Sequence, residues 1–218
     1  MTSTEVVDIL SQIKTALDSN NKTAVYSLLF DLQRREYQKL LEKDDNCEED
    51  PPTEITSDGT KIWKNAKGQI HRDKDKPAMI YTDGTMVWYK EGEFHREEDK
   101  PAKILSDGTL IWCKEGEDHR DGDKPAKVWA SGTLNWFKKG KFHRDGDKPA
   151  IMLANGTQKW CQNGDLHREE DKPAIIESDG TQKWCQRDRI HRDGGKPAVI
   201  YKDGRKEWYI EGNLIRKE

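Results

Sequence analysis

The chain has 218 residues, of which 33% are hydrophobic and 36% are charged; its mean hydropathy is −1.07 and its formal net charge is −3. So polar a chain cannot surround one large globular core, and its balanced charge excludes an overall basic field for nucleic acid. No apolar run approaches the length of a membrane span, and the start MTSTEVVDIL is unlike a signal peptide. Four scattered cysteines without a close pair predict a reducing, intracellular setting.

Residues 1–43 predict an α-helical hairpin. Apolar residues recur at helical spacing from Val6 to Leu17, and a second amphipathic helix is expected over residues 23–42. Two such helices are too small to be stable alone. Their apolar stripes are therefore expected to pack on the first repeat, on a second copy of the chain as a homodimer, or on a partner. Residues 44–54, which are acidic and end in proline, predict a solvated linker.

Residues 55–218 repeat one unit of about 24 residues, which is clearest at Asp83–Ile104. The unit reads DGT-x-x-W-(x)-G-x-x-HR-(x)-KPA-x-I, and each of the six histidines of the chain is followed by arginine in this register. A fixed period of this length predicts a repeat protein, in which each unit contacts only its neighbours. The tryptophans in register are expected to form the structural core of the repeats: Trp63, Trp88, Trp112, Trp136, Trp160, Trp184 and Trp208.

Each unit predicts a β-hairpin. Asp-Gly-Thr between two alternating apolar runs is a tight-turn signal, because glycine supplies the positive φ that a two-residue hairpin needs. Strands are expected over residues 78–81 and 85–89, with Trp88 on one face and Val87 on the other. Residues 91–100 are interpreted mostly as a long connection.

A 24-residue unit fits two architectures. In a β-solenoid, identical positions would stack about 4.8 Å apart, and columns of like charge would cost about 1 kcal/mol per neighbouring pair. In a meander with two strands per unit, identical positions lie about 9.6 Å apart, near one Debye length. We therefore expect a mainly β fold: an elongated antiparallel β-repeat array of seven hairpin units.

The order of turn, aromatic strand, Gly-x-x-His, short strand and next turn resembles the MORN repeat. The resemblance covers about Asp58 to the C-terminus, where Ile215 replaces the histidine of the last unit. The MORN pattern has tyrosine and glycine before its tryptophan and a glycine after its histidine. Here Trp88 comes sooner and Arg96 follows His95, so the repeat is a MORN-like variant.

Repeats of this His-Arg and Lys-Pro-Ala type also resemble those in proteins of large DNA viruses and some bacteria. The resemblance implies hairpins in an elongated single-layer sheet, and a scaffold that makes protein contacts, self-associates and in some members contacts phospholipid, without catalysis of its own. With the reducing setting that the cysteines predict, we expect a cytoplasmic location, which for a viral protein is the host cytoplasm.

The periodic polar residues do not suggest a metal or cofactor site. A column of histidines spreads ligands along an axis instead of converging on a point, so histidine is expected to pack or hydrogen-bond and arginine to pair with a nearby acidic residue. Calcium needs several oxygens at fixed positions, but only one acidic position persists, which we interpret as a turn residue: Asp75, Asp99, Asp123, Asp147 and Asp171. Cysteines that alternate with aromatic residues after the tryptophan indicate packing.

These patterns predict a non-enzymatic interaction protein, without catalytic residues or cofactors, that binds a protein partner along its repeats. The candidate protein-binding residues recur two positions before the turn: Tyr81, Leu105, Trp129, Leu153 and Tyr201. The alternative is a binder of anionic lipid or, less expected, nucleic acid through an arginine row: Arg72, Arg96, Arg120, Arg144, Arg168 and Arg192.

Overall fold

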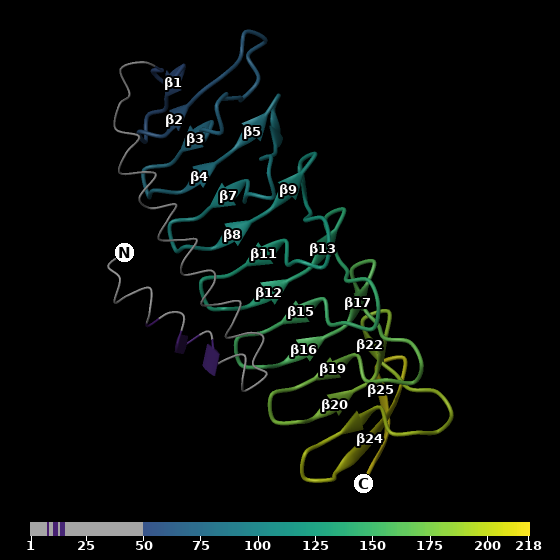
Figure 1. Ribbon diagram of the computed structural model, residues 1–218. Helices are drawn as coiled ribbons and strands as arrows, with labels where there is room; N and C mark the ends of the chain where they lie inside the picture. The colour runs from purple at the N-terminus through teal and green to yellow at the C-terminus, as the bar shows by residue number, and fades with distance from the viewer. Residues whose placement is uncertain (1–7, 9–10, 13, 16–49) are drawn as a thin grey trace.

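The structure is a computed structural model, which describes residues 8, 11–12, 14–15 and 50–218. The expected helical hairpin of residues 1–43 and the start of the linker lie outside the described residues. Residues 50–218 form a long ribbon of short β-hairpins stacked side by side (Figure 1). The fold is mainly β, as expected.

Fifteen short strands form one antiparallel sheet, called the main sheet below. Each unit contributes two strands joined by the glycine turn, so the array is a meander and not a solenoid. In spatial order the strands are β1 (Glu54–Ile55), β2 (Lys61–Ile62), β3 (Met79–Ile80), β4 (Met86–Val87), β7 (Lys103–Ile104), β8 (Leu110–Ile111), β11 (Lys127–Val128), β12 (Leu134–Asn135), β15 (Ile151–Met152), β16 (Gln158–Lys159), β19 (Ile175–Ile176), β20 (Gln182–Lys183), β23 (Val199–Ile200), β24 (Lys206–Ile210) and β25 (Asn213–Lys217).

A second, smaller hairpin follows the tryptophan in each of five units, so residues 91–100, interpreted mostly as a connection, also contain the turn and the second strand of a hairpin. Its turn in the first of them is Glu91-Gly92, both at positive φ, which suits a two-residue hairpin. Glutamate is an unusual residue for that conformation, which hid the turn in the sequence. These side hairpins pair β5 (Tyr89–Lys90) with β6 (Glu93–Phe94), β9 (Cys113–Lys114) with β10 (Glu117–Asp118), β13 (Phe137–Lys138) with β14 (Lys141–Phe142), β17 (Cys161–Gln162) with β18 (Asp165–Leu166) and β21 (Cys185–Gln186) with β22 (Arg189–Ile190).

The main sheet divides its apolar residues between two faces as the alternation predicts. The tryptophan face packs the rings of Trp88, Trp112 and Trp136 with Met86, Leu110 and Leu134. The opposite face packs Val87 with Tyr89 and Phe94, and Ile111 with Cys113, so it is closed by the side hairpins. Six of the seven repeat tryptophans are buried: Trp63, Trp88, Trp112, Trp136, Trp160 and Trp184. Trp208, in the seventh unit, is half-buried.

The Asp-Gly-Thr turns also join neighbouring units. The carboxylate of Asp83 accepts hydrogen bonds from the backbone N–H and the hydroxyl of Thr85. The hydroxyl oxygen of Thr85, which is buried, in turn accepts the N–H of Ser106 in the next unit at 3.0 Å. The same contact recurs in three further pairs of units. The threonine of the motif therefore sets the spacing between successive turns, and its burial satisfies its polar group.

The end of the linker belongs to the array and is not simply solvated, as the sequence had suggested. The carbonyl of Asp50 accepts the indole N–H of Trp63 at 3.1 Å, and its carboxylate pairs with Arg72 at 2.7 Å. The hydroxyl of Thr53 accepts the backbone N–H of Lys64 at 2.9 Å. The first unit is therefore anchored by residues that precede β1.

We expect Trp136→Ala to lower the free energy of unfolding by about 3–5 kcal/mol, because the ring is buried between units. The matched control is Trp129→Ala, which removes the same side chain from a site that is 38% exposed and should cost less than about 1 kcal/mol. Urea denaturation followed by far-UV circular dichroism measures both. Equal losses in the two variants would contradict the placement of the core.

Candidate functional site

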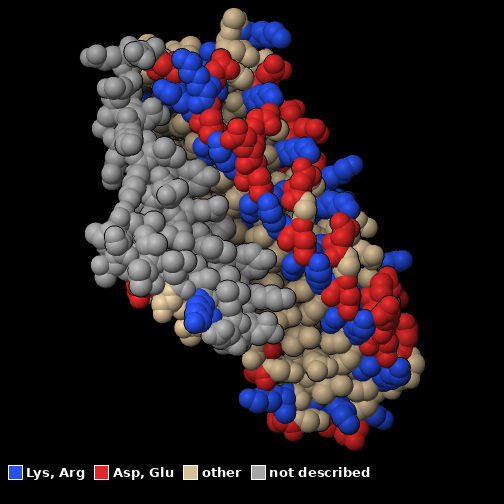
Figure 2. All heavy atoms as spheres, viewed as in Figure 1, with Lys and Arg blue, Asp and Glu red and all other residues tan. Residues whose placement is uncertain are grey.

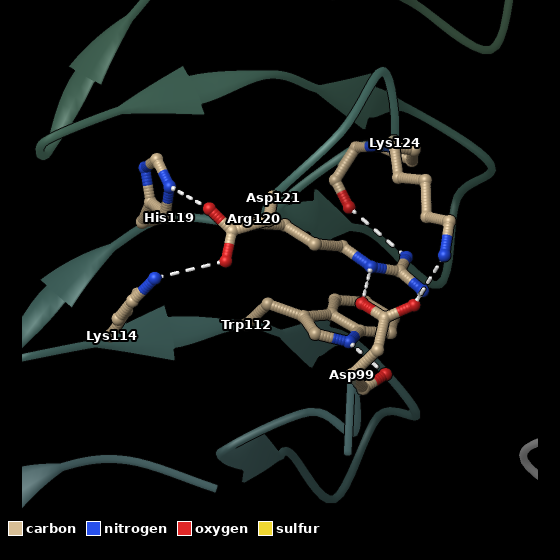
Figure 3. Close-up of polar contacts among 8 residues, drawn as sticks. Asp99, Trp112, Lys114, His119, Arg120, Asp121 and Lys124 are labelled. Carbon is tan, nitrogen blue, oxygen red and sulfur yellow. Dashed lines mark hydrogen bonds and ion pairs between the residues drawn. The ribbon is translucent and has the colours of Figure 1, made fainter. Parts of the chain in front are cut away.

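The most elaborate polar cluster of each unit is built around the arginine that follows histidine (Figure 3). The guanidinium carbon of Arg120 lies 3.8 Å from the ring centroid of Trp112. Its Nε and Nη2 donate to the two carboxylate oxygens of Asp99 at 2.6 and 3.0 Å, and Nη1 donates to the carbonyl of Pro125 at 3.3 Å. The side chain is only 11% exposed. Stacking and bidentate pairing together require the planar, permanently charged guanidinium.

The aspartate in this cluster belongs to the preceding unit and is held by three side chains of the next one. Besides Arg120, the carboxylate of Asp99 accepts Lys124 Nζ at 2.6 Å, and the backbone carbonyl of Asp99 accepts the indole N–H of Trp112 at 2.8 Å. The carboxylate contacts recur at every persistent acidic position: Asp75, Asp99, Asp123, Asp147 and Asp171. The turn residue that the sequence predicts is thus also the ion-pair partner between units.

These cations hold the aspartates in the charged form. Hydrogen bonds from Arg144, and then from Lys148, lower the pKa of Asp123 to about 2, although partial burial opposes the shift. Arg168 and Lys172 lower the pKa of Asp147 in the same way. The carboxylates are therefore ionised throughout the neutral range and form part of the structure.

Four histidines, His71, His119, His143 and His191, connect their own loop with the backbone of the next unit. His119 Nε2 lies 3.0 Å from the carboxylate of Asp121, and its Nδ1 accepts the backbone N–H of Lys139 at 3.4 Å. The N–H of Glu91 reaches Nδ1 of His71 at 3.1 Å in an equivalent contact. Because Nδ1 accepts, the ring proton is assigned to Nε2. Within the described part of the chain, no three His, Cys, Asp or Glu side chains are grouped to hold a metal ion.

Two turn types distinguish the loops after the His-Arg pair. In the loop before Trp112, both central turn residues, Glu98 and Asp99, have positive φ. In the loop before Trp136, which reads Asp-Gly-Asp, glycine takes the positive φ and Asp123 does not, and the indole N–H of Trp136 has no hydrogen-bond partner. The same difference recurs one unit later. In both units, a loop that reads Asp-Gly-Asp thus coincides with a buried indole N–H that has no hydrogen-bond partner.

Hollows of about 300 to 330 Å³ lie between successive His-Arg loops at four junctions. The hollow between the fourth and fifth His-Arg loops, for example, is lined by His143, Asp147, Trp160, Arg168 and Lys172. Figure 2 shows basic and acidic side chains alternating along this side of the array. Each hollow has a lining of both charge signs and nearly the same composition, so no hollow stands out as a unique chemical site.

The candidate arginine row is already engaged inside the structure. The side chains of Arg96 and Arg168, at the extremes among the five that pair with loop aspartates, are 4% and 14% exposed. All six stack on a tryptophan and pair with an aspartate: Arg72, Arg96, Arg120, Arg144, Arg168 and Arg192. Little guanidinium surface is left for an external anion.

The candidate protein-binding row, called the turn row below, is only partly exposed. Tyr81 is 39% exposed and Trp129 is 38% exposed. Leu105, Leu153 and Tyr201 are half-buried, and Leu105 packs against the Ile111 and Cys113 cluster. The regular spacing predicted from the sequence is present, but only Tyr81 and Trp129 of the turn row are exposed.

The three described cysteines are free and buried, as the packing interpretation expects. Burial raises the pKa of the Cys113 and Cys161 thiols to about 12 and that of Cys185 to about 11. A thiol that stays protonated at neutral pH is a poor nucleophile and a poor metal ligand.

Comparisons with protein-family models, with curated proteins and with solved structures find no match to this chain. Among the described residues, no helix has the length and apolarity needed to cross a membrane.

We expect Arg144→Lys to lower the free energy of unfolding by about 1–3 kcal/mol, because lysine can neither stack flat on Trp136 nor pair bidentately with Asp123. The control Lys138→Gln removes an exposed ion pair with Asp145 and should change stability by less than about 0.5 kcal/mol. Urea unfolding measures both. If Arg144→Lys loses no more stability than the control, the stacking and bidentate pairing of the arginine do not stabilise the array.

The loop aspartates predict acid sensitivity. Because the pKa of Asp123 falls from 3.8 to about 2 on folding, its contribution to stability is complete above pH 4 and is lost as pH falls toward 2. Asp123→Asn should be less stable than the wild type at pH 7, and the difference should narrow between pH 4 and pH 2. The urea denaturation midpoints of both proteins, measured across this pH range, test the prediction. A stability difference that does not change with pH would contradict the lowered pKa of Asp123.

Proposed function

We propose that the chain is a MORN-like, non-enzymatic interaction protein that binds a protein partner along the turn row. The observation that supports this most directly is the exposure of Tyr81 and Trp129 on a molecule whose other repeat aromatics are largely buried. Aromatic side chains are enriched among the residues that dominate protein interfaces. An array without a unique cleft, but with a long periodic edge, suits a partner that binds along it.

The spacing of the turn row suggests an extended partner segment. Successive units are two strands apart, about 9.6 Å, so Tyr81 and Trp129 lie about 19 Å apart along the sheet. An extended chain rises about 3.3 Å per residue, so about six partner residues span the two rings. Lys127 Nζ lies 3.8 Å from the ring centroid of Trp129, so an ammonium already occupies one face of this ring.

The described geometry gives less support to the lipid or nucleic-acid alternative. The arginines it requires are stacked and paired, and acidic side chains alternate with the basic ones along the loop side (Figure 2). An anion would have to displace Asp99 or Asp123 from a bidentate contact before it met a free guanidinium. We therefore base the proposed function on the turn row.

A cytoplasmic location is part of the same proposal. Three buried, free cysteines fit a reducing compartment. Self-association through residues 1–43 concerns residues outside the described part of the chain and is treated as an outcome to be measured.

We expect the double variant Tyr81→Ser and Trp129→Ser to lose a specific protein that wild-type protein retains in a pull-down from native cells, because the variant lacks the two exposed rings. The control Lys90→Ser and Lys138→Ser changes two exposed side chains in the side hairpins and should retain that protein. Thermal melts verify that all three proteins are folded. Equal retention by all three, or salt-sensitive binding of all three to anionic vesicles, would contradict the proposed function.

A further inference from the structure

Lysines interrupt an apolar row on the face of the main sheet that carries the turn row. Residues that pair directly across neighbouring strands lie on the same side of a sheet. Such pairs run without a gap along this face: Lys103–Ile111, Ile111–Lys127, Lys127–Asn135, Asn135–Ile151 and Ile151–Lys159. The three lysines therefore share one face, and they are called the lysine ladder below: Lys103, Lys127 and Lys159.

The repeat itself does not require lysine at these positions. Lys103 and Lys127 are the first residues of β7 and β11, and the same position is apolar in four other units: Met79, Ile151, Ile175 and Val199. Lys159 directly precedes its tryptophan, as apolar residues do in three other units: Ile62, Val87 and Ile111. Bringing an ammonium group against a sheet costs solvation free energy that an apolar side chain does not. The stacking of the units therefore does not account for the lysine ladder.

Aromatic rings hold two of the ladder ammonium groups. Lys103 Nζ lies 3.4 Å from the ring centroid of Phe94, and Lys127 Nζ lies 3.8 Å from that of Trp129 in the turn row. These contacts are attractive but supply no negative charge. Within residues 50–218, no carboxylate lies within ion-pair distance of Lys103, Lys127 or Lys159. The three positive charges are therefore available to carboxylates of another molecule.

The array contains one example of how a lysine on this face binds a carboxylate. Lys183 occupies the position of Lys159 one unit later, and its Nζ donates to a carboxylate oxygen of Glu177 at 2.6 Å. Glu177 stands where the turn row has an apolar or aromatic residue in the other units. In the unit of Lys159 that residue is Leu153. A carboxylate placed along the turn row is thus within reach of a ladder lysine.

We propose that the partner segment on the turn row is acidic and that its carboxylates pair with the lysine ladder as Glu177 pairs with Lys183. This inference rests on the proposed function and names the chemistry of the partner. Lys103 and Lys127 are two strand steps apart, about 9.6 Å. A polyproline II segment presents the same side every three residues, or about 9.3 Å at 3.1 Å per residue. Carboxylates three residues apart therefore meet these two lysines, and apolar residues between them reach Trp129.

Nucleic acid and an anionic membrane fit the lysine ladder less well. Each strand of a duplex carries a phosphate about every 3.4 Å, so lysines about 9.6 Å apart would neutralise about one phosphate in three. The carboxylates of Asp83 and Asp107 in the adjacent turns would repel the remaining phosphates. A flat membrane surface requires protruding cations, whereas two ladder ammonium groups lie against aromatic rings.

The test uses the full-length protein and a fluorescein-labelled peptide of four Glu-Pro-Leu repeats, with binding measured by fluorescence anisotropy. The triple variant Lys103→Met, Lys127→Met and Lys159→Met should bind at least about tenfold more weakly than the wild type, because it loses three charge-assisted pairs. Methionine keeps most of the side-chain length and already occupies the position of Lys103 in another unit, at Met79, so the fold is retained.

The matched control removes three exposed lysines of the side hairpins: Lys90→Met, Lys114→Met and Lys138→Met. It has the same net charge as the ladder variant and should bind the peptide within about twofold of the wild type, because exposed pairs away from the site contribute little. Equal weakening in the two triple variants would overturn the inference, since the effect would then be one of net charge. So would a wild type that does not bind the peptide, or that binds single-stranded DNA more tightly.

A second variant tests the pairing with all lysines in place. Leu153→Glu supplies Lys159 with a carboxylate in the arrangement of Glu177 and Lys183, and should weaken peptide binding at least about threefold because that ammonium is then occupied. Unchanged binding would contradict the role of Lys159.

The native partner separates this inference from the proposed function. If the variant Tyr81→Ser and Trp129→Ser loses the partner in the pull-down and the ladder variant retains it, the proposed function stands and this inference fails. If the ladder variant loses the partner and the ring variant retains it, the turn row is not the binding site and the proposed function fails. Retention by both variants overturns both.

Discussion

The array depends on an arginine that is held between a tryptophan of its own unit and an aspartate of the preceding one. A sheet of two-residue strands makes few hydrogen bonds per strand, so another interaction must join the units. Arg120 provides it by stacking on Trp112 and pairing with Asp99, with the proline carbonyl as a third partner. Because the side chain is nearly buried, the ion pair and the stack are less screened by water than a surface pair.

The same cluster explains how so charged a chain forms an ordered repeat. The arginine and lysine of each loop pair with the aspartate of the preceding loop, and the aspartate of each loop pairs with the arginine and lysine of the next one. Opposite charges therefore alternate along the array. Rows of like charge are thereby neutralised at the five junctions that have a loop aspartate, and the formal net charge is only −3. The last junction shows the limit of this scheme. Gly195 keeps the carbonyl that binds Trp208 but has no carboxylate, and Arg216 pairs with Glu218 instead.

The sequence predicted the hairpins of the main sheet because their signals are local. Glycine in the Asp-Gly-Thr turn and the alternation around Trp88 lie within a few residues. The sequence did not predict the side hairpins, because Glu91 takes a positive φ that its residue type rarely adopts. The pairing of Arg120 with Asp99 escaped for another reason: its partners are 21 residues apart, and the period alone does not say which unit supplies the acid. The exposure of Tyr81 but not Leu105 is a result of packing, which no spacing reveals.

The units differ in surface chemistry at the positions where their residues depart from the repeat pattern. In a periodic array, residues that recur from unit to unit maintain the stacking of the units. The recurring tryptophan, arginine and aspartate therefore account for the stability of the array and not for differences between its units. Trp129 in the turn row differs from its counterpart in another unit, Glu177. It is larger and more apolar than the repeat needs at that position. Such residues cost solubility when exposed, and contact with another surface is the physical circumstance that offsets this cost.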